Sequence, residues 1–172
     1  KPGIQTVALI GMGGVGKTTL ARQFARQQKT SVIWEMNAET NQSLHSSFED
    51  LAISLAKAPE DKKTLREIQE TKDEKERETK LLSFVKERLR LLSNWLLIYD
   101  NVEKFSDIQK YFPHDPITWG AGKVLITTRD NNIQNDSHVN YGLQIEELNS
   151  NQKLALFSKI VGNEQLTKIK TH

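Results

Sequence analysis

The sequence predicts an α/β domain with a mostly parallel sheet, and three observations lead to this fold class. Short apolar runs of strand length alternate with longer stretches of helical periodicity, which is the pattern of successive βαβ units. The length of 172 residues corresponds to one domain, or one domain with a small appendage, at about 100–200 residues per domain. Hydrophobic residues make up 37% of the chain, which is enough to form a core at this length.

The first half of the chain predicts two strand–helix units. An apolar run over residues 6–10 predicts the first strand, and apolar residues at helical spacing predict a helix over residues 17–28. The second strand is expected over residues 31–36 and its helix over residues 42–57. Pro59 breaks this second helical pattern, so the helix is expected to end before it.

Residues 60–80 differ in composition from the rest of the chain. From Asp61 to Lys80 nearly every residue is charged or polar, which predicts an exposed helix or a mobile loop. The positive charges are interleaved with acids, which favours a solvated face over a nucleic-acid groove. Apolar residues at helical spacing return between Leu81 and Leu92 and predict a long amphipathic helix.

Three strands and a final helix are expected in the second half. Two apolar runs of the buried type cover residues 95–100 and 123–127, and a weaker strand is expected over residues 141–145. A last helix is expected to begin at Asn149 or Ser150, since both side chains are good N-caps.

Charge and cysteine content exclude several classes of protein. The 24 Lys and Arg residues against 22 Asp and Glu residues give a net charge of +2, which attracts neither nucleic acid nor an anionic membrane strongly. No apolar run reaches the roughly 18 residues of a membrane-spanning helix. Without cysteine the chain has no disulfide framework, thiolate zinc site or cysteine nucleophile. We therefore expect a cytoplasmic protein that binds neither nucleic acid nor membrane directly.

The first residue and the histidines give little functional information. The chain begins at Lys1 without a signal-peptide pattern, and we expect it to be a fragment of a longer protein. The four histidines lack metal-ligand spacing and a recognisable partner pattern, so we expect solvated or packed roles for them. They are His45, His114, His138 and His172.

A phosphate-binding loop is the most specific feature of the sequence. Residues 11–18 fill every fixed position of the pattern G-x-x-x-x-G-K-[ST], directly after a predicted strand and before a predicted helix. Glycines let backbone N–H groups approach phosphate oxygens, Lys17 can reach the β and γ phosphates, and the Thr18 hydroxyl can bind Mg²⁺. The alternative is a glycine-rich turn with a solvated lysine. The expected nucleotide-binding residues here are Gly11, Met12, Gly13, Gly14, Val15, Gly16, Lys17, Thr18 and Thr19.

A second anchor for Mg²⁺ is expected at Asp100. This carboxylate follows the apolar strand that begins at Trp95, as required of the acidic partner in a nucleotide site of this type. Asn101 comes next, and an amide can orient a water molecule but cannot accept its proton. The sequence therefore predicts slow turnover, with Thr18 and Asp100 as metal ligands.

Arg129 comes just after the predicted strand of residues 123–127. It directly follows two threonines, Thr127 and Thr128. At a strand end its guanidinium group can reach a γ-phosphate, because the planar fork of donors suits phosphate oxygens. The alternative is an ordinary surface arginine. The expected catalytic residues are thus Lys17, Asp100, Asn101 and Arg129.

Four segments together resemble the NB-ARC domain, the nucleotide switch of plant disease-resistance proteins and apoptotic protease-activating factors. The first segment, residues 11–21, is shared by many nucleotide hydrolases, whereas the last two are far more specific in this order. The other three segments are residues 96–102, 122–129 and 141–157.

The resemblance implies an ATP/ADP-binding switch of the STAND class of P-loop ATPases. It implies a three-layer sandwich with a five-stranded sheet in the order 5-1-4-3-2. By this resemblance Lys17 and Thr18 hold phosphate and Mg²⁺, Asp100 is the magnesium carboxylate and Arg129 is the sensor arginine. The domain is expected over residues 1–162, with a charged insertion at about 60–80.

The resemblance also implies partners outside the chain, and residues 163–172 are expected to extend toward the rest of a truncated protein. Neighbouring domains and an ATP-dependent homo-oligomer are expected in the full-length context. The family usually has a second acid where Asn101 stands, so only weak ATPase activity is expected. Two alternatives stay open: a non-hydrolysing interaction module stabilised by nucleotide, and another P-loop ATPase or small-molecule kinase.

Overall fold

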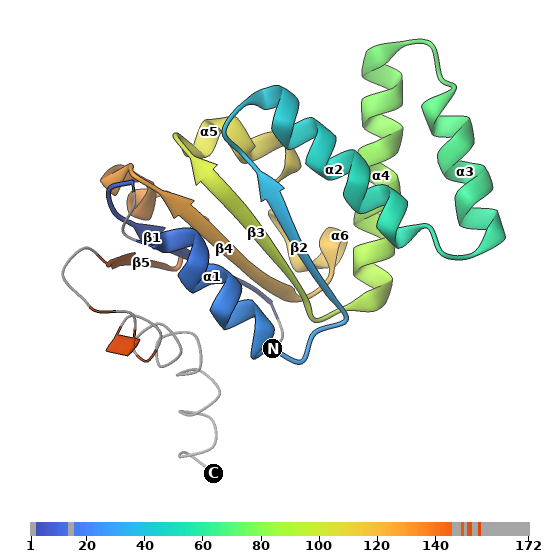
Figure 1. Cartoon of the computed structure of the whole chain (residues 1–172). Coiled ribbons are helices and arrows are strands. Elements are labelled where there is room, and N and C mark those ends of the chain that lie inside the picture. The colour runs from blue at the N-terminus through green and yellow to red at the C-terminus, as the bar shows by residue number, and fades with distance from the viewer. Residues whose placement is uncertain (1–2, 14–15, 146–148, 150, 153–154, 156–172) are drawn as a thin grey trace.

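Five strands of the described chain form one sheet, and all four pairings between neighbours are parallel (Figure 1). The computed structural model describes residues 3–13, 16–145, 149, 151–152 and 155. The strands are β1 (Ile4–Ile10), β2 (Val32–Asn37), β3 (Trp95–Val102), β4 (Gly122–Thr128) and β5 (Tyr141–Gln144). Their order across the sheet is β2-β3-β4-β1-β5. This is the expected order 5-1-4-3-2 read from the opposite edge, so the predicted topology is confirmed.

Helices cover both faces of the sheet because the apolar side chains of its strands alternate between them. In β3, Leu96 and Ile98 lie in a cluster with helix α1 (Lys17–Arg26). Leu97 and Tyr99 belong to a larger cluster of buried side chains. Figure 1 shows α1 crossing in front of the strands, while α5 and α6 lie behind them. The predicted three-layer sandwich is therefore confirmed.

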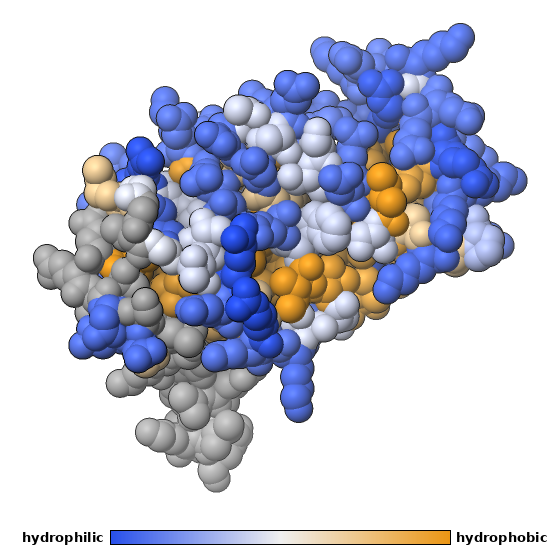
Figure 2. All heavy atoms as spheres, in the orientation of Figure 1, coloured by the Kyte–Doolittle hydropathy of each residue, from blue (hydrophilic) through white to orange (hydrophobic). Residues whose placement is uncertain are grey.

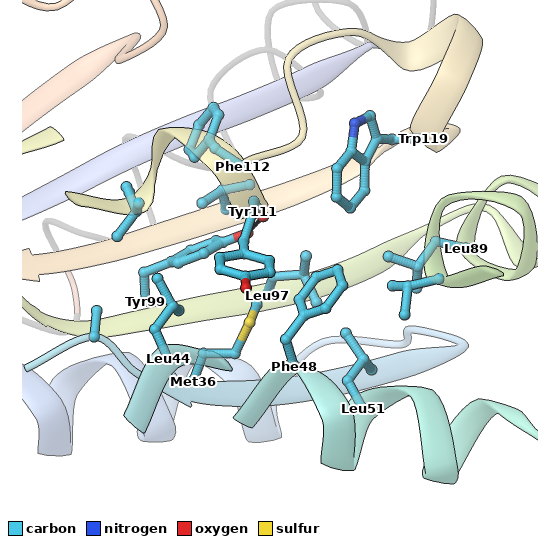
Figure 3. Close-up of a cluster of buried hydrophobic side chains, with 14 of the residues drawn as sticks. Met36, Leu44, Phe48, Leu51, Leu89, Leu97, Tyr99, Tyr111, Phe112 and Trp119 are labelled. Carbon is cyan, nitrogen blue, oxygen red and sulfur yellow. Dashed lines mark hydrogen bonds between the residues drawn. The ribbon is translucent and has the colours of Figure 1, made fainter. Parts of the chain in front are cut away.

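Aromatic rings form the centre of the larger cluster (Figure 3). The ring centroid of Phe48 lies 4.8 Å from that of Tyr111 and 6.4 Å from that of Trp119. The indole N–H of Trp95 donates to the carbonyl of Trp119 at 2.9 Å, so this buried polar group is satisfied. The elements that contribute from outside the sheet are α2 (Asn41–Leu55), α3 (Pro59–Gln69), α4 (Glu74–Leu92), α5 (Phe105–Ile108), α6 (Pro116–Trp119), and the 3-10 helices η1 (Gln109–Tyr111) and η2 (Asn131–Asn135).

Helix α2 begins and ends close to the predicted positions. Thr40 caps its N-terminus: the Thr40 hydroxyl accepts from the Ser43 N–H at 3.0 Å, and the Thr40 N–H donates to the Ser43 hydroxyl at 3.1 Å. The helix ends at Leu55, before Pro59, as expected. Pro59 then becomes the first residue of α3, a position that needs no backbone donor.

The charged insertion forms a packed helical hairpin, so the expected exposed helix is confirmed and the mobile loop is wrong. Leu65 and Ile68 of α3 are buried against the rest of the chain. Asp61 accepts a hydrogen bond from Arg88 of α4 at 2.6 Å. Figure 1 shows the α3–α4 hairpin projecting beyond the strands, and Figure 2 shows its outer surface as hydrophilic. Leu65 and Ile68 therefore join α3 to the large buried cluster, which also includes side chains of α4.

Helix α4 begins earlier than the apolar periodicity predicts, at Glu74 and not at Leu81. The side chain of Asp73 caps it by accepting from the Glu76 N–H at 3.0 Å, and the first turn carries acids that favour the positive end of the helix dipole. The helix has 19 residues, but charges recur along it. In the part of the chain that the structure describes, no helix is both long and apolar enough to cross a membrane.

Asn149 caps a further helical turn, as predicted. Its side-chain oxygen accepts from the Gln152 N–H at 2.9 Å, and its own N–H donates to the Gln152 side chain at 3.1 Å. The alternative cap Ser150 and most of the predicted last helix lie outside the described residues.

Candidate nucleotide-binding site

The parallel sheet brings the chemically active ends of three strands together. In a parallel sheet all the carboxyl ends lie at one edge, and the strand order places β4 between β1 and β3. Ile10 at the end of β1 pairs with Thr128 at the end of β4, and the Gly11 N–H donates to the Thr128 carbonyl at 3.1 Å. The phosphate-binding loop therefore begins beside Arg129, which lies more than 110 positions later in the chain.

The loop turns directly into helix α1. Gly16 has a φ of 87°, a left-handed conformation that glycine adopts without steric cost, and its carbonyl accepts from the Leu20 N–H at 2.9 Å. Helix α1 begins at Lys17, so its N-terminal amides and the positive end of its dipole face the loop. The predicted residues Gly14 and Val15 lie outside the described residues.

Lys17 is held inside the loop. Only 7% of its surface is exposed, and its ammonium group donates to the carbonyls of Gly11 at 2.6 Å and Met12 at 2.9 Å. Because of these contacts, the Lys17 side chain folds back over the loop and does not extend into solvent. The alternative of a solvated lysine is therefore wrong for this residue. Its charge lies where the loop amides would hold phosphate oxygens.

Asp100 lies at the centre of a hydroxyl network. Its Oδ1 accepts from the Thr18 hydroxyl at 2.6 Å and from the Thr127 hydroxyl at 2.7 Å. The Thr127 oxygen in turn accepts from the Asn101 N–H at 2.9 Å. The two predicted metal ligands, one on α1 and one on β3, are thus in direct contact. A hydroxyl and a carboxylate are the hard oxygen ligands that Mg²⁺ takes, so the residues present fit this ion.

Asn101 lies at the edge of an open cleft of about 540 Å³. Its φ of 62° is left-handed, and asparagine is one of the few side chains that tolerates this conformation. Glu39, which follows β2, lines the same cleft. The Ala38 N–H donates to the Asp100 carbonyl at 2.8 Å, which brings the end of β2 level with Asp100 on β3.

Arg129 reaches across this cleft to the phosphate-binding loop. Its side chain is exposed and lines the cleft together with Asn101. A Cβ added at Gly13 would meet the Arg129 guanidinium group, with its Cζ at 3.1 Å. The arginine therefore lies directly over the loop that would hold the phosphates. This position favours the predicted phosphate contact over a surface role without partners.

A neighbouring ion pair ties α1 to the edge strand β2. Arg22 donates two hydrogen bonds to the Glu35 carboxylate, at 3.0 and 2.8 Å. These hydrogen bonds and the charge of Glu35 raise the pKa of the Arg22 guanidinium, with a smaller contribution from Asp100. The side chains of Arg22 and Glu35 are 52% and 31% exposed, so water screens the pair and it contributes little to stability.

A family model described as the NB-ARC domain matches residues 1–167, which is nearly the whole chain. The chain belongs to the NB-ARC domain family. This match confirms the resemblance that the four sequence segments indicate. Membership of this family supports nucleotide binding by the domain as a whole.

This NB-ARC domain is similar to curated proteins of one plant species. The Arabidopsis thaliana proteins named "Probable disease resistance protein RF45" and "Probable disease resistance protein RDL5" are each 28% identical over 167 residues, which is 91% of this chain. The chain spans only 15% of the length of these relatives.

A solved structure of the Signal Transduction ATPase with Numerous Domains (STAND) protein with a tetratricopeptide repeat sensor from Pyrococcus horikoshii is also similar. It superposes with a TM-score of 0.45 at 15% identity, over 92% of this chain and 26% of that chain.

The described site gathers most of the predicted residues of the NB-ARC domain and adds others. Thr19 is exposed on the first turn of α1. Thr127 and Glu39 are part of the site, although the sequence does not mark either as a site residue. Their signal is their place at the carboxyl ends of predicted strands, which becomes informative only when the strand order is known. The predicted residues brought together are Gly11, Met12, Gly13, Gly16, Lys17, Thr18, Asp100, Asn101 and Arg129.

Proposed function

We propose that this NB-ARC domain binds ATP and ADP as the switch of a larger signalling protein and hydrolyses ATP slowly with Mg²⁺. The observation that carries the proposal is the contact of 2.6 Å between the Thr18 hydroxyl and the Asp100 carboxylate beside the buried Lys17. This arrangement combines a phosphate-binding loop with a pair of magnesium ligands.

Phosphate binding would use the backbone first and side chains second. The loop from Gly11 to Gly16 leads into the N-terminus of α1, where free N–H groups and the helix dipole favour an anion. Lys17 would exchange its two carbonyl acceptors for β- and γ-phosphate oxygens, which are stronger partners because they are charged. Arg129 would approach the γ-phosphate over Gly13.

Thr18 and Asp100 would hold Mg²⁺ between them and the nucleotide. When bound, the ion would neutralise charge on the β- and γ-phosphate oxygens. The Thr127 hydroxyl donates to the same Asp100 carboxylate oxygen. It would thereby orient this metal ligand without contacting the ion itself.

Hydrolysis by this site would be slow because the residue that follows Asp100 in the sequence is an asparagine and not a base. Asn101 can position a water molecule but cannot accept its proton. We therefore expect ATP turnover well below about 1 s⁻¹, which is slow for an enzyme. A non-hydrolysing domain that retains nucleotide for stability is the second candidate, and the same asparagine favours it.

The switch itself requires parts beyond this chain. ATP and ADP can shift an equilibrium between two arrangements only if each binds them with different affinity. The chain spans 15% of the length of its relatives. We therefore propose that it works with neighbouring domains, in a nucleotide-dependent homo-oligomer and in the cytoplasm.

Calorimetric titration of ATP and ADP into the chain, with and without Mg²⁺, tests the nucleotide assignment. We expect both nucleotides to bind, with ATP binding strengthened by Mg²⁺. Lys17→Ala should weaken ATP binding by about 10- to 100-fold, because it removes charge-assisted hydrogen bonds of about 1.5–3 kcal/mol. Lys62→Ala, on the exposed surface of α3, is the matched control and should leave affinity unchanged. Equal ATP affinity in Lys17→Ala and the parent chain would contradict the assignment.

Single-turnover hydrolysis of radiolabelled ATP separates the two candidates. Slow release of phosphate that depends on Mg²⁺ supports the hydrolysing switch. Tight binding of ATP that stays intact for hours supports the non-hydrolysing module. Rapid turnover by the isolated chain would contradict both.

A further inference from the structure

Glu39 places a carboxylate beside the candidate nucleotide site. It lines the same open cleft of about 540 Å³ as Asn101 and Arg129, the arginine that lies over the phosphate-binding loop. The amide of Asn101 can position a water molecule in this cleft but cannot accept its proton. A carboxylate from another part of the chain can supply the missing proton acceptor, so the surroundings of Glu39 bear directly on hydrolysis.

Strand pairing brings Glu39 to the edge of the sheet that carries the site. Asn37, the last residue of β2, pairs with Asp100 of β3, and the Ala38 N–H donates to the Asp100 carbonyl at 2.8 Å. Figure 1 shows β2 and β3 running side by side to this edge. Glu39 is the next residue after this contact. Its main chain therefore lies beside the main chain of Asp100 and Asn101.

Hydrogen bonds hold the main chain on both sides of Glu39. The Glu39 N–H donates to the Asn37 side-chain oxygen at 3.0 Å, which closes a turn directly after β2. Thr40 is the next residue and caps α2 together with Ser43, whose hydroxyl also donates to the Asn37 carbonyl at 2.9 Å. The connection between β2 and α2 is thus fixed to the sheet, and only the side chain of Glu39 has to be ordered around a substrate.

The Glu39 carboxylate is available to a water molecule. It is exposed, and in the part of the chain that the structure describes it takes part in no hydrogen bond or ion pair. Two nearby acids are engaged instead: Glu35 pairs with Arg22 at 2.8 Å, and Asp130 accepts from the Asn132 N–H at 3.0 Å. An ionised carboxylate without a donor keeps its lone pairs for a water proton.

We propose that Glu39 is the general base of ATP hydrolysis in this domain and that Asn101 orients the attacking water. This inference rests on the proposed function. The water oxygen forms a bond to the γ-phosphorus while the bond from that phosphorus to the bridging oxygen breaks, and its electron pair leaves with ADP. One proton of the water passes to the Glu39 carboxylate, which releases it to solvent after the phosphate has formed.

This division of tasks is consistent with slow turnover. The base is an exposed side chain from the neighbouring strand, so water screens it and its position is less defined than that of an acid directly after Asp100. Glu103 lines the same cleft and is the rival acid. Glu103 lies in the bend between β3 and α5, whereas the main chain at Glu39 is held by the hydrogen bonds described above. We therefore assign the base to Glu39.

Single-turnover hydrolysis of ATP by the full chain tests the assignment, with ATP affinity measured by calorimetry in the same variants. Glu39→Gln keeps the size and polarity of the side chain but cannot accept a proton. We expect phosphate release to slow on the order of 10²-fold in this variant, while ATP affinity stays unchanged. Glu67→Gln, on the exposed surface of α3, is the matched control and should release phosphate at the parent rate. Glu103→Gln should also retain the parent rate.

A double variant separates proton transfer from a structural effect. Asn101→Asp combined with Glu39→Gln restores an acid to the cleft and should release phosphate faster than Glu39→Gln alone. Thermal unfolding checks that each variant is folded. Failure of the double variant to recover any rate overturns the proposal, because loss of a base can be rescued by a new base.

The remaining outcomes distinguish this proposal from the proposed function. A parent rate in Glu39→Gln overturns the role of Glu39 and leaves ATP hydrolysis by the domain intact. A loss of rate in Glu103→Gln with none in Glu39→Gln has the same meaning and assigns the base to the rival acid. Weaker ATP binding in Glu39→Gln with an unchanged rate from the bound state overturns it as well. ATP that the parent chain binds and leaves intact contradicts the hydrolysing function itself, and the role of Glu39 with it.

Discussion

The guanidinium group of Arg129 occupies the space that a side chain at position 13 would need, and Gly13 leaves this space open. The two residues come from the ends of neighbouring parallel strands, β1 and β4. The glycine therefore does more than permit a tight loop: it lets an arginine from another strand approach the phosphates. The length of the arginine side chain and the lack of a Cβ at Gly13 are complementary.

Gly13→Ala should displace Arg129 with little effect on stability. The added methyl group meets the flexible end of the arginine, which can move away at low cost. We expect a change of less than about 0.5 kcal/mol in the free energy of unfolding but at least a tenfold loss in ATP affinity or turnover. Gly3→Ala is the control, since nothing lies within 4 Å of its added Cβ. Unchanged ATP affinity and turnover in Gly13→Ala would show that the arginine does not act on the nucleotide.

Asp100→Asn should remove the effect of Mg²⁺ on ATP binding. The amide keeps a side-chain oxygen that can accept from Thr18 and Thr127, but it loses the charge that the ion requires. Calorimetry should give similar affinities with and without Mg²⁺ in this variant, whereas the parent chain binds ATP more tightly with the ion. Asp50→Asn, on the exposed surface of α2, should retain the Mg²⁺ effect. Full retention of the effect in Asp100→Asn would assign the metal to other ligands.

Asn101→Asp should accelerate hydrolysis. The new carboxylate can accept the proton of the attacking water, which the amide cannot do, and a general base of this kind contributes on the order of 10²-fold or more. Phosphate release under single-turnover conditions measures the change. Asn135→Asp, exposed in η2, is the charge-matched control and should not change the rate. A variant no faster than its parent would place the limit on turnover elsewhere than in this residue.

Glu78→Gln should destabilise the domain at neutral pH and much less in acid. Burial raises the pKa of the Glu78 carboxyl, but hydrogen bonds from Lys110 and Tyr111 outweigh it, and the net pKa lies below its ordinary value. Stability from such a group is present above its unfolded pKa, near 4.3, and is lost as pH falls through the lower folded pKa. Urea unfolding should show a loss of about 1 kcal/mol at pH 7 that disappears near pH 2–3.

Glu70→Gln provides the comparison for this pH effect. This glutamate is exposed at the end of α3, and its substitution should change stability little at either pH. A Glu78→Gln difference that stayed constant between pH 7 and pH 3 would show that the carboxylate charge contributes nothing.

The sequence predicts the strands of this domain well because each is a run of apolar residues with a clear end. The run of residues 95–100 lies within β3, and the run of residues 123–127 lies within β4. Both strands have helices on each face, so they need no polar alternation that would obscure the pattern. The strand order itself follows from the family resemblance and not from these runs.

The hairpin of α3 and α4 shows what composition alone cannot provide. Leu65 and Ile68 are two apolar residues in a charged segment, and they become informative only when α4 offers an apolar face. The cap at Asp73 extends that helix by two turns of charged residues. Periodicity of apolar residues marks the buried part of a helix, whereas capping decides where the helix begins.

The candidate site also contains some residues that the sequence predicts and others that it does not. Lys17, Thr18 and Asp100 are predictable because their spacing and their flanking strands are part of a recognisable pattern. Thr127 contacts Asp100 because β4 lies next to β3. Glu39 lines the cleft because β2 lies on the other side of β3. Such neighbours depend on the register between strands, which no local sequence pattern specifies.

The left-handed backbone at Asn101 also bears on how the activity of such a domain can evolve. Aspartate is enriched in this conformation alongside asparagine, while a longer acidic side chain such as glutamate is disfavoured there. Codons for asparagine and aspartate differ by one base. A lineage carrying this turn can therefore gain or discard a second acid through a single nucleotide substitution, with the main chain already in place.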